Sequence, residues 1–294
     1  MIPYLFLLPA FLILLLTVFL PAGQAFFLSF TRYEYDLTQA PQWVGSTNLQ
    51  RLWADPVFWK TLGNSLLYLV VVVPVLVIIP LLLAILINRK LWGINWFRAA
   101  FYTPVVISMV VAGIAWRWLY SSNGLFNQFL KIFNLEAIPW LTSPRWALFS
   151  VMGVTVWKGL GYYMLIYLAG LQSIPQELYE AAAIDGVDGV GKHWSITLPL
   201  MRPYLLLVGV ISAISAIKVF EEVFIMTQGG PLNSSKTLVY YLYEQAFNNL
   251  EISYACAIGL VMFLAIFLLS ILNLKLSSSS TSSDSPSGRL SQRA

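Results

Sequence analysis

A glycine-rich stretch at residues 186–193 has residue types and spacing that could bind phosphate. Its sequence, GVDGVGKH, nearly matches the motif GxxxxGK[ST], in which backbone N–H groups and a lysine hold phosphate oxygens while a hydroxyl binds Mg²⁺. The hydroxyl position holds His193 instead, and no strand-like apolar run precedes Gly186. We therefore predict no nucleotide site here.

Histidine and cysteine, which serve metal binding and nucleophilic catalysis, occur once each. A lone His193 supports neither a multi-histidine metal site nor a hydrolase triad. Cys256 lies in an apolar run and cannot form an internal disulfide, so we interpret it as a small hydrophobic residue. No catalytic residue, metal or cofactor is predicted, and we expect the chain not to be an enzyme.

Lys158 is a charged residue inside an otherwise apolar segment. An unpaired charge there costs at least about 2.5–3.5 kcal/mol on insertion scales, so such residues usually face a cavity or a partner helix. Trp157, Tyr162 and Tyr163 lie close in sequence, and aromatic faces with hydroxyl groups suit sugars. These four residues are candidates for a solute pathway. Alternatively, Lys158 extends towards water and the aromatic residues lie at the membrane interface.

The loop at 171–202 contains a short helix. Gln176 to Ile184 is a run of good helix formers, and Asp185-Gly186 ends it because glycine favours the left-handed conformation found after a helix. About ten residues rise roughly 15 Å, which is too short to cross a membrane.

Flanking residues extend this pattern. Ser173 and Gln176 have the spacing of a capping box, with Pro175 in the first turn. A second helical stretch is predicted at about 190–195, before Pro199.

The helix presents a narrow, acidic surface made by Glu177, Glu180, Ala181, Ala182 and Ala183. A helix that lies on a membrane surface should be rich in Lys and Arg, so an ordinary surface helix is the less favoured alternative. We interpret it as a docking element for a cytoplasmic partner.

Composition places these segments in a membrane protein. The 294 residues are 59% hydrophobic and 10% charged, whereas soluble domains carry roughly 25% charged residues. This excludes a cytosolic enzyme, a nucleic-acid binder and a disordered regulator. Long uncharged windows predict an all-α, polytopic membrane protein with six transmembrane helices, at about 4–29, 62–88, 98–120, 146–170, 203–226 and 252–274.

The positive-inside rule orients these spans. Arg89, Lys90 and Arg98 lie in or beside the loop after the second span, which contains no acidic residue, so this loop and both termini are expected in the cytoplasm. The loop at 171–202 is then cytoplasmic too. A signal peptide is the weaker interpretation of the first window, because its apolar run is long and no basic residue precedes it. The Ser-rich segment 277–294 is expected to be a disordered tail.

The loop at 171–202 resembles the EAA signature of bacterial binding-protein-dependent ABC importer permeases. The match consists of Glu180, Ala181, Ala182, Gly186, Ile196, Leu198 and Pro199, at every fixed position and spacing. The similarity to this family extends over nearly the whole of 1–276. Within it, residues 157–175 resemble the carbohydrate-uptake branch of the family. It implies that this loop is the coupling helix, with Glu180, Ala181, Ala182 and Gly186 as its docking residues.

A second signature resembles the outer loop of maltose F-type and glycerol-3-phosphate A-type subunits. Phe220-Glu221-Glu222 precedes a turn at Gly229, Gly230 and Pro231. Glu221 and Glu222 are expected to contact the binding protein, to gate the pathway, or simply to be solvated.

The resemblance implies a subunit in the lipid bilayer of the bacterial inner membrane that imports a sugar or related polyol. Its implied partners are a companion permease, an ABC ATPase dimer on the cytoplasmic side and an extracytoplasmic solute-binding protein; no nucleic acid is expected. A non-sugar cargo such as glycerol-3-phosphate remains open, as does a secondary carrier or channel, although neither a carrier nor a channel requires an acidic docking helix.

Overall fold

The computed structural model describes residues 2–33, 40–88, 92–187 and 189–281. Within them, four helices are long and apolar enough to cross a membrane, or up to six if each of two bent helix pairs is one span. The predicted all-α polytopic class is confirmed. The two strands, β1 (Thr31–Arg32) and β2 (Gln42–Trp43), form one short antiparallel pair.

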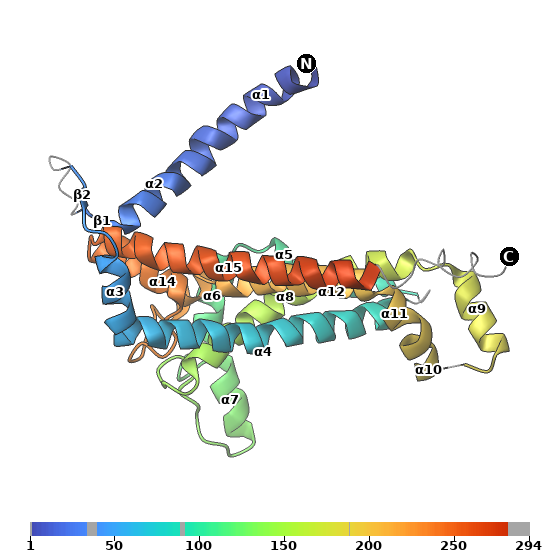
Figure 1. The fold of residues 1–294 in the computed structure, drawn as a ribbon. Helices are drawn as coiled ribbons and strands as arrows, with labels where there is room; N and C mark the ends of the chain where they lie inside the picture. The colour runs from blue at the N-terminus through green and yellow to red at the C-terminus, as the bar shows by residue number, and fades with distance from the viewer. Residues whose placement is uncertain (1, 34–39, 89–91, 188, 282–294) are drawn as a thin grey trace.

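Four helices lie alongside one another and form the body of the molecule (Figure 1). They are α4 (Pro56–Ile87), α8 (Ala147–Gln172), α12 (Arg202–Ile217) and α15 (Ile252–Thr281). The centre of the α4–α8 contact is apolar or aromatic and has no exposed surface, as seen at Tyr68, Val72, Val151, Val154 and Tyr167. Burial of this face, rather than sequence propensity, holds the helices side by side.

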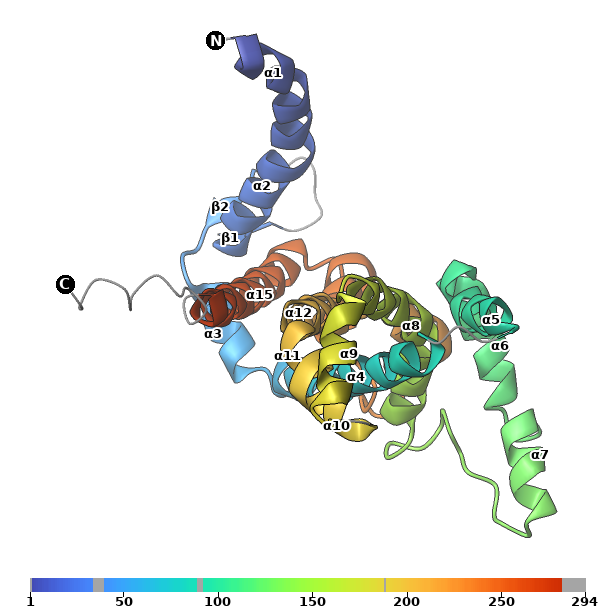
Figure 2. The same ribbon diagram turned by 90° about the vertical axis from the view of Figure 1, so that its right-hand side faces the viewer.

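The first predicted span is a helical arm that leaves the body. α1 (Ile2–Leu14), a π-helical turn (Leu15–Phe19) and α2 (Leu20–Ser29) follow one another and project away in two perpendicular views (Figures 1 and 2). None of its most apolar window is buried, and it meets the body where Phe26 contacts Phe263 of α15. Such an apolar surface requires lipid or another protein chain around it.

The third predicted span, 98–120, is two helices. α5 (Ile94–Val106) and α6 (Met109–Leu119) meet at 99°, with an extended backbone at Ile107 and Ser108. The Ser108 hydroxyl accepts a hydrogen bond from the N–H of Val111, so it caps the second helix.

The fifth predicted span, 203–226, is also divided. α12 stops at Ile217, and the short α13 (Glu221–Met226) follows after a break. α15 extends further than predicted and includes residues 277–281, which the sequence assigned to the tail. The remainder of that tail, 282–294, lies outside the described residues.

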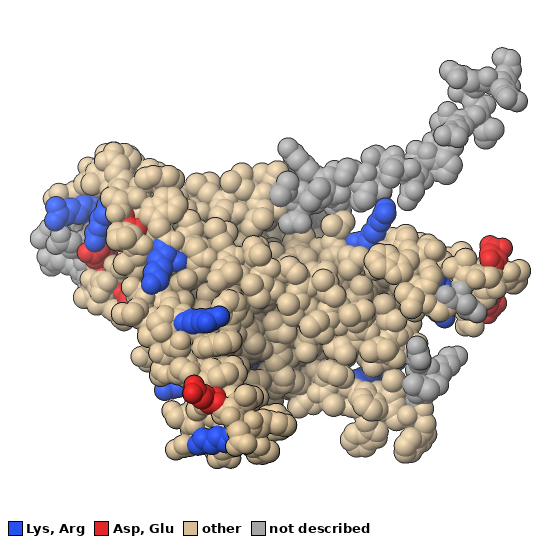
Figure 3. Space-filling model, turned by 90° about the horizontal axis from the view of Figure 1, so that it is seen from below, with Lys and Arg blue, Asp and Glu red and all other residues tan. Residues whose placement is uncertain are grey.

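Shorter helices lie at one end and at one side of the body. α3 (Thr47–Ala54), α14 (Leu238–Tyr243) and the π-helical turn Glu244–Asn248 lie at one end, while α7 (Leu125–Ile132) projects to the side (Figure 1). On the face seen in Figure 3, charged side chains gather towards the two ends and leave a band without charge between them. That distribution fits a bilayer core across the middle of the bundle.

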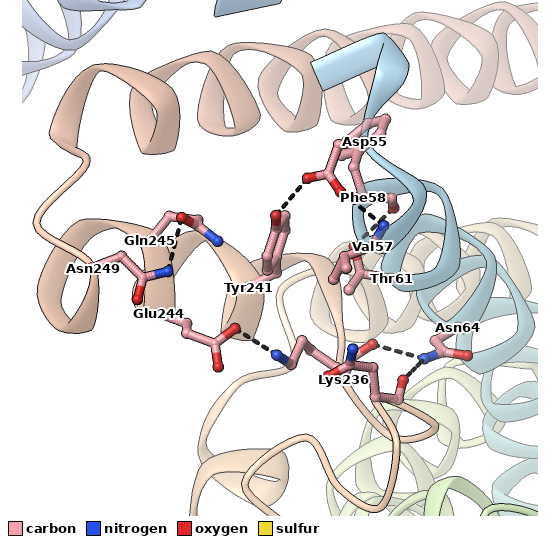
Figure 4. Close-up of polar contacts among 11 residues, drawn as sticks. Asp55, Val57, Phe58, Thr61, Asn64, Lys236, Tyr241, Glu244, Gln245 and Asn249 are labelled. Carbon is pink, nitrogen blue, oxygen red and sulfur yellow. Dashed lines mark hydrogen bonds and ion pairs between the residues drawn. The ribbon is translucent and has the colours of Figure 1, made fainter. Parts of the chain in front are cut away.

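Asp55 organises the end of the bundle opposite α9 (Gln176–Ile184), where α3 and α14 lie (Figure 1), and its contacts are drawn in Figure 4. Its Oδ1 accepts the N–H of Val57 and caps α4, while its Oδ2 accepts the hydroxyls of Tyr241 at 2.5 Å and Tyr254 at 2.6 Å. Burial alone would raise the pKa of this carboxyl, but these hydrogen bonds, with one from the Phe58 backbone, hold its pKa below the ordinary 3.8. The carboxylate thus joins α4, α14 and α15.

Replacing Asp55 by Ala should lower the free energy of unfolding by about 2–4 kcal/mol, measured by SDS titration in mixed micelles, because a helix cap and charged hydrogen bonds are lost. Glu136→Ala, at an exposed carboxylate, is the control and should change it by less than about 0.5 kcal/mol. The folded-state pKa of Asp55 is the lower one, so the contribution is complete above about pH 4 and declines as pH falls through that pKa. A gap between wild type and variant that stays constant from pH 6 to pH 3 would contradict this role.

Candidate functional site

The predicted docking helix is present as α9 (Gln176–Ile184), with the bounds read from the sequence. It ends at Asp185, and Gly186 has φ +77°, the left-handed conformation expected after the helix. The start of the helix differs from prediction. The N-cap is Pro175 without a side-chain cap, because the Ser173 hydroxyl donates to the Gly170 carbonyl instead.

The chain then returns towards the body as a second helical segment. It comprises α10 (Val190–Lys192), a π-helical turn (His193–Thr197) and α11 (Leu198–Leu200), and so runs longer than the predicted 190–195. A bend of 68° separates it from α12. α9 and this segment form a helical hairpin, which we call the coupling hairpin (residues 171–202), in front of the bundle when viewed from its end (Figure 2).

The residues of the EAA signature occupy different depths of the hairpin. Glu180, Ala181 and Gly186 are exposed, whereas Ala182 is the one buried residue of α9. In the second segment Ile196 and Leu198 are half-buried, and Pro199 is exposed. The surface available to a partner therefore includes Glu180, Ala181 and Gly186, while Ala182 holds α9 against its own chain.

A cavity of about 330 Å³ lies among α4, α8 and α12. Three of the four sequence-predicted pathway residues, Lys158, Tyr162 and Tyr163, line it. Trp157 does not, and packs instead edge-on against Trp116, with ring centroids 5.3 Å apart. Its place on α8, one residue before Lys158, turns it to another side of the helix.

Lys158 faces both this cavity and the break between α5 and α6. Its Nζ donates a hydrogen bond to the carbonyl of Ile107, the extended residue after α5. The last carbonyls of a helix have no partner within that helix, and a lysine from a neighbouring helix can supply one. The charge within the fourth span thus has an acceptor in the broken third span.

Glu222 lines the cavity, whereas the sequence predicted only that it lies at the outer end of the fifth span. Its Oε1 accepts a hydrogen bond from Thr155, whose hydroxyl lies 2.5 Å from that of Tyr68. Glu222 and Lys158 therefore bring opposite charges to one cavity, together with hydroxyls that include Ser212 and Ser215. The available signal was the acidic pair Glu221-Glu222, which follows Lys218 shortly after the uncharged window 203–217.

The Gly-Gly-Pro turn lies at the end opposite the coupling hairpin (Figure 1). Gly229 has φ +75°, and an added Cβ would lie 3.0 Å from side-chain atoms of Lys236 and Tyr240, so a larger residue does not fit. The Ser235 hydroxyl donates to the Gly230 carbonyl at 2.6 Å, and the Gly230–Pro231 bond is cis.

The outer end of α4 fixes this loop in place. Lys60 Nζ donates to the Leu232 carbonyl at 2.7 Å. The Asn64 amide, shown beside Lys236 in Figure 4, donates to the carbonyls of Asn233 and Lys236 at 2.9 Å each. Lys236 itself pairs with Glu244 at 2.5 Å. The Gly-Gly-Pro turn and the coupling hairpin therefore form separate sites at opposite ends of the bundle. α8 connects the cavity to the hairpin.

Comparisons with known proteins identify relatives over most of the chain. The chain is 38% identical to the lactose transport system permease protein LacF of Rhizobium radiobacter over 234 residues, covering 78% of each. It is 37% identical to the arabinooligosaccharides transport system permease protein AraP of Bacillus subtilis, covering 94% of this chain and 88% of the relative.

The fold is also similar to a solved structure. A chain of the bacterial alginate ABC transporter, crystallised with an alginate pentasaccharide-bound periplasmic protein, superimposes with a TM-score of 0.81 at 23% identity, covering 94% of this chain and 93% of the other. Residues 52–279 match the family model described as binding-protein-dependent transport system inner membrane component. This protein therefore belongs to the family of binding-protein-dependent transport system inner membrane components.

Proposed function

We propose that this chain forms half of the translocation pathway of an ATP-driven importer for a sugar or related polyol. The observation that carries the proposal is the exposed, acidic helix α9, which stands at one end of a membrane bundle and bears the EAA signature. Family membership and relatives named for lactose and arabinooligosaccharide transport support the cargo class.

The coupling hairpin docks into a separate ATPase subunit. Glu180 and Ala181 present a small, acidic surface that another chain can approach closely, and Gly186 leaves open space beside the turn. When two ATPase subunits close on ATP, a helix seated in each moves with it. Because the hairpin continues directly into α8 and α12, that movement tilts the two helices that line the cavity.

The cavity suits a neutral, polyhydroxylated solute. The tyrosine rings offer apolar faces, while Ser215 and Thr155 offer hydroxyls. Lys158 and Glu222 balance one another, so the charged residues of the lining give no net attraction for an anion. This favours a sugar or polyol over glycerol-3-phosphate as cargo.

Three further partners complete the transporter. The lipid bilayer surrounds the charge-free band, and a companion permease supplies the second half of the pathway. A solute-binding protein contacts the end that carries Gly229, Gly230 and Pro231. The solved alginate transporter complex, which contains a periplasmic protein, supports a partner of this kind. Both termini and the coupling hairpin lie in the cytoplasm, in agreement with Arg89, Lys90 and Arg98.

A secondary carrier or channel for a small solute is the alternative function. Neither would require an ATPase or a docking helix at this end of the bundle. Purification of the chain from its native membrane distinguishes the two, because only the importer should retain an ATPase subunit.

Glu180→Lys should abolish coupling while the protein still inserts. Reversal of one contact charge at the docking surface should lower ATP-dependent uptake by about 10- to 100-fold, measured in whole cells with immunoblotted membranes. Glu136→Lys, at an exposed carboxylate outside the coupling hairpin, is the control. Uptake at the wild-type rate in the Glu180 variant would rule out the docking assignment.

Lys158→Met and Glu222→Gln should each reduce uptake, because each leaves the other charge unbalanced in the cavity. The double variant should lose less than the sum of the two, with a coupling free energy of about 0.5–3 kcal/mol calculated from uptake rates. Lys131→Met, on the exposed surface of α7, is the control. Strict additivity would mean that the two charges act separately.

The cargo is tested with the cognate solute-binding protein by calorimetry against lactose, arabinooligosaccharides, maltose and glycerol-3-phosphate. We expect a sugar to bind. Binding of glycerol-3-phosphate alone would overturn the sugar assignment but leave the ATP-driven importer intact.

A further inference from the structure

The two arms of the coupling hairpin are joined by a buried hydroxyl that the EAA signature does not include. Thr197, at the end of the π-helical turn, has no exposed surface. Its Oγ1 lies 3.0 Å from the hydroxyl of Tyr179 on α9 and 3.1 Å from Nδ1 of His193. A hydroxyl has one donor and two acceptor positions, so Thr197 can bond both neighbours at once.

This link matters because α9 has little other attachment. Ala182 is its one buried residue, and the helix stands out from the bundle (Figure 1). A small apolar contact opposes sliding and separation only weakly, whereas a hydrogen bond to the buried Thr197 hydroxyl is directional. Tyr179, next to Glu180, ties the docking surface to the returning arm.

A second contact closes the base of the hairpin. Gly170, near the end of α8, lies so close to Tyr204 of α12 that an added Cβ would come within 2.7 Å of the tyrosine ring. The Tyr204 hydroxyl lies 3.4 Å from that of Ser173, just before α9. The hairpin is thus tied at its base and, through Thr197, at its middle.

We propose that Tyr179, Thr197 and His193 form a clamp that makes the coupling hairpin move as one rigid body. This rests on the proposed coupling function. The three side chains are positioning residues: Glu180 meets the ATPase, and the clamp passes the displacement of α9 to α12 as well as to α8. Without it, α9 follows the ATPase while the second arm stays behind.

The test uses the full complex of both permeases and the ATPase in nanodiscs, with Cys256→Ala and spin labels at Ile184→Cys and Leu268→Cys. Ile184 ends α9 and Leu268 lies on α15, and both are exposed.

The distance between the two labels is measured by double electron–electron resonance without nucleotide and with ATP plus vanadate. Tyr179→Phe and Thr197→Val remove the clamp, Thr197→Ser restores a hydroxyl, and Tyr102→Phe, at an exposed tyrosine of α5, is the matched control.

In the clamp variants we expect the labels to show a second distance beside the main one. The ratio of the second population to the main one should be about 2- to 10-fold higher than in wild type, which is the factor expected for loss of one hydrogen bond. The shift caused by ATP and vanadate should become heterogeneous, while the ATPase still co-purifies. Thr197→Ser and Tyr102→Phe should behave as wild type.

Unchanged distances in Tyr179→Phe and Thr197→Val, with the ATPase bound, would overturn the clamp. Failure of Thr197→Ser to restore the single distance would also overturn it, because the effect would then come from lost packing of the methyl group. Absence of an ATPase from the wild-type complex would instead contradict the proposed function.

Discussion

The hydrocarbon core of a bilayer offers no water to an unpaired backbone group, and this constraint connects the most unusual features of the bundle. At Ile107 and Ser108 the helix is interrupted, so backbone groups lose their partners within it. Ser108 accepts the N–H of Val111, and Lys158 donates to the carbonyl of Ile107. Irregular backbone at membrane depth is tolerated where protein buries it or where it lines a cavity, and here Ile107 is half-buried and bonded to a lysine that lines the cavity. The same lysine that satisfies the break also brings a positive charge into the cavity.

That charge in turn explains the chain of polar groups opposite it. A lone cation in a largely apolar cavity would be costly, and Glu222, held by Thr155 and Tyr68, provides the opposite charge. α4, α8 and α13 are therefore joined by polar contacts as well as by apolar packing. The lining of the cavity therefore combines two opposite charges with hydroxyls and aromatic rings.

The two ends of the bundle are rigid for different reasons. At one end Asp55 gathers two tyrosine hydroxyls, while Lys60 and Asn64 hold the loop after α13 by its carbonyls. At the other end a hairpin stands out from the bundle and is stiffened mainly by Thr197 and by the close contact of Gly170 with Tyr204. Helices α8 and α12 flank that hairpin in the chain and both line the cavity, so continuous backbone joins the hairpin to the cavity.

The sequence by itself determined the membrane class, the approximate helical segments and the short helix after α8, whose bounds of 176–184 agree with the structure. These features depend on local composition, on the length needed to cross a bilayer and on the left-handed conformation that glycine allows. Only the tertiary structure decided that the third span bends at Ile107, that Glu222 turns into the cavity while Trp157 turns away, and that Ser173 bonds Gly170 instead of capping α9. Each of these outcomes depends on which distant partner reaches a polar group, and such pairings between residues far apart in the chain leave no periodic signal in a single sequence.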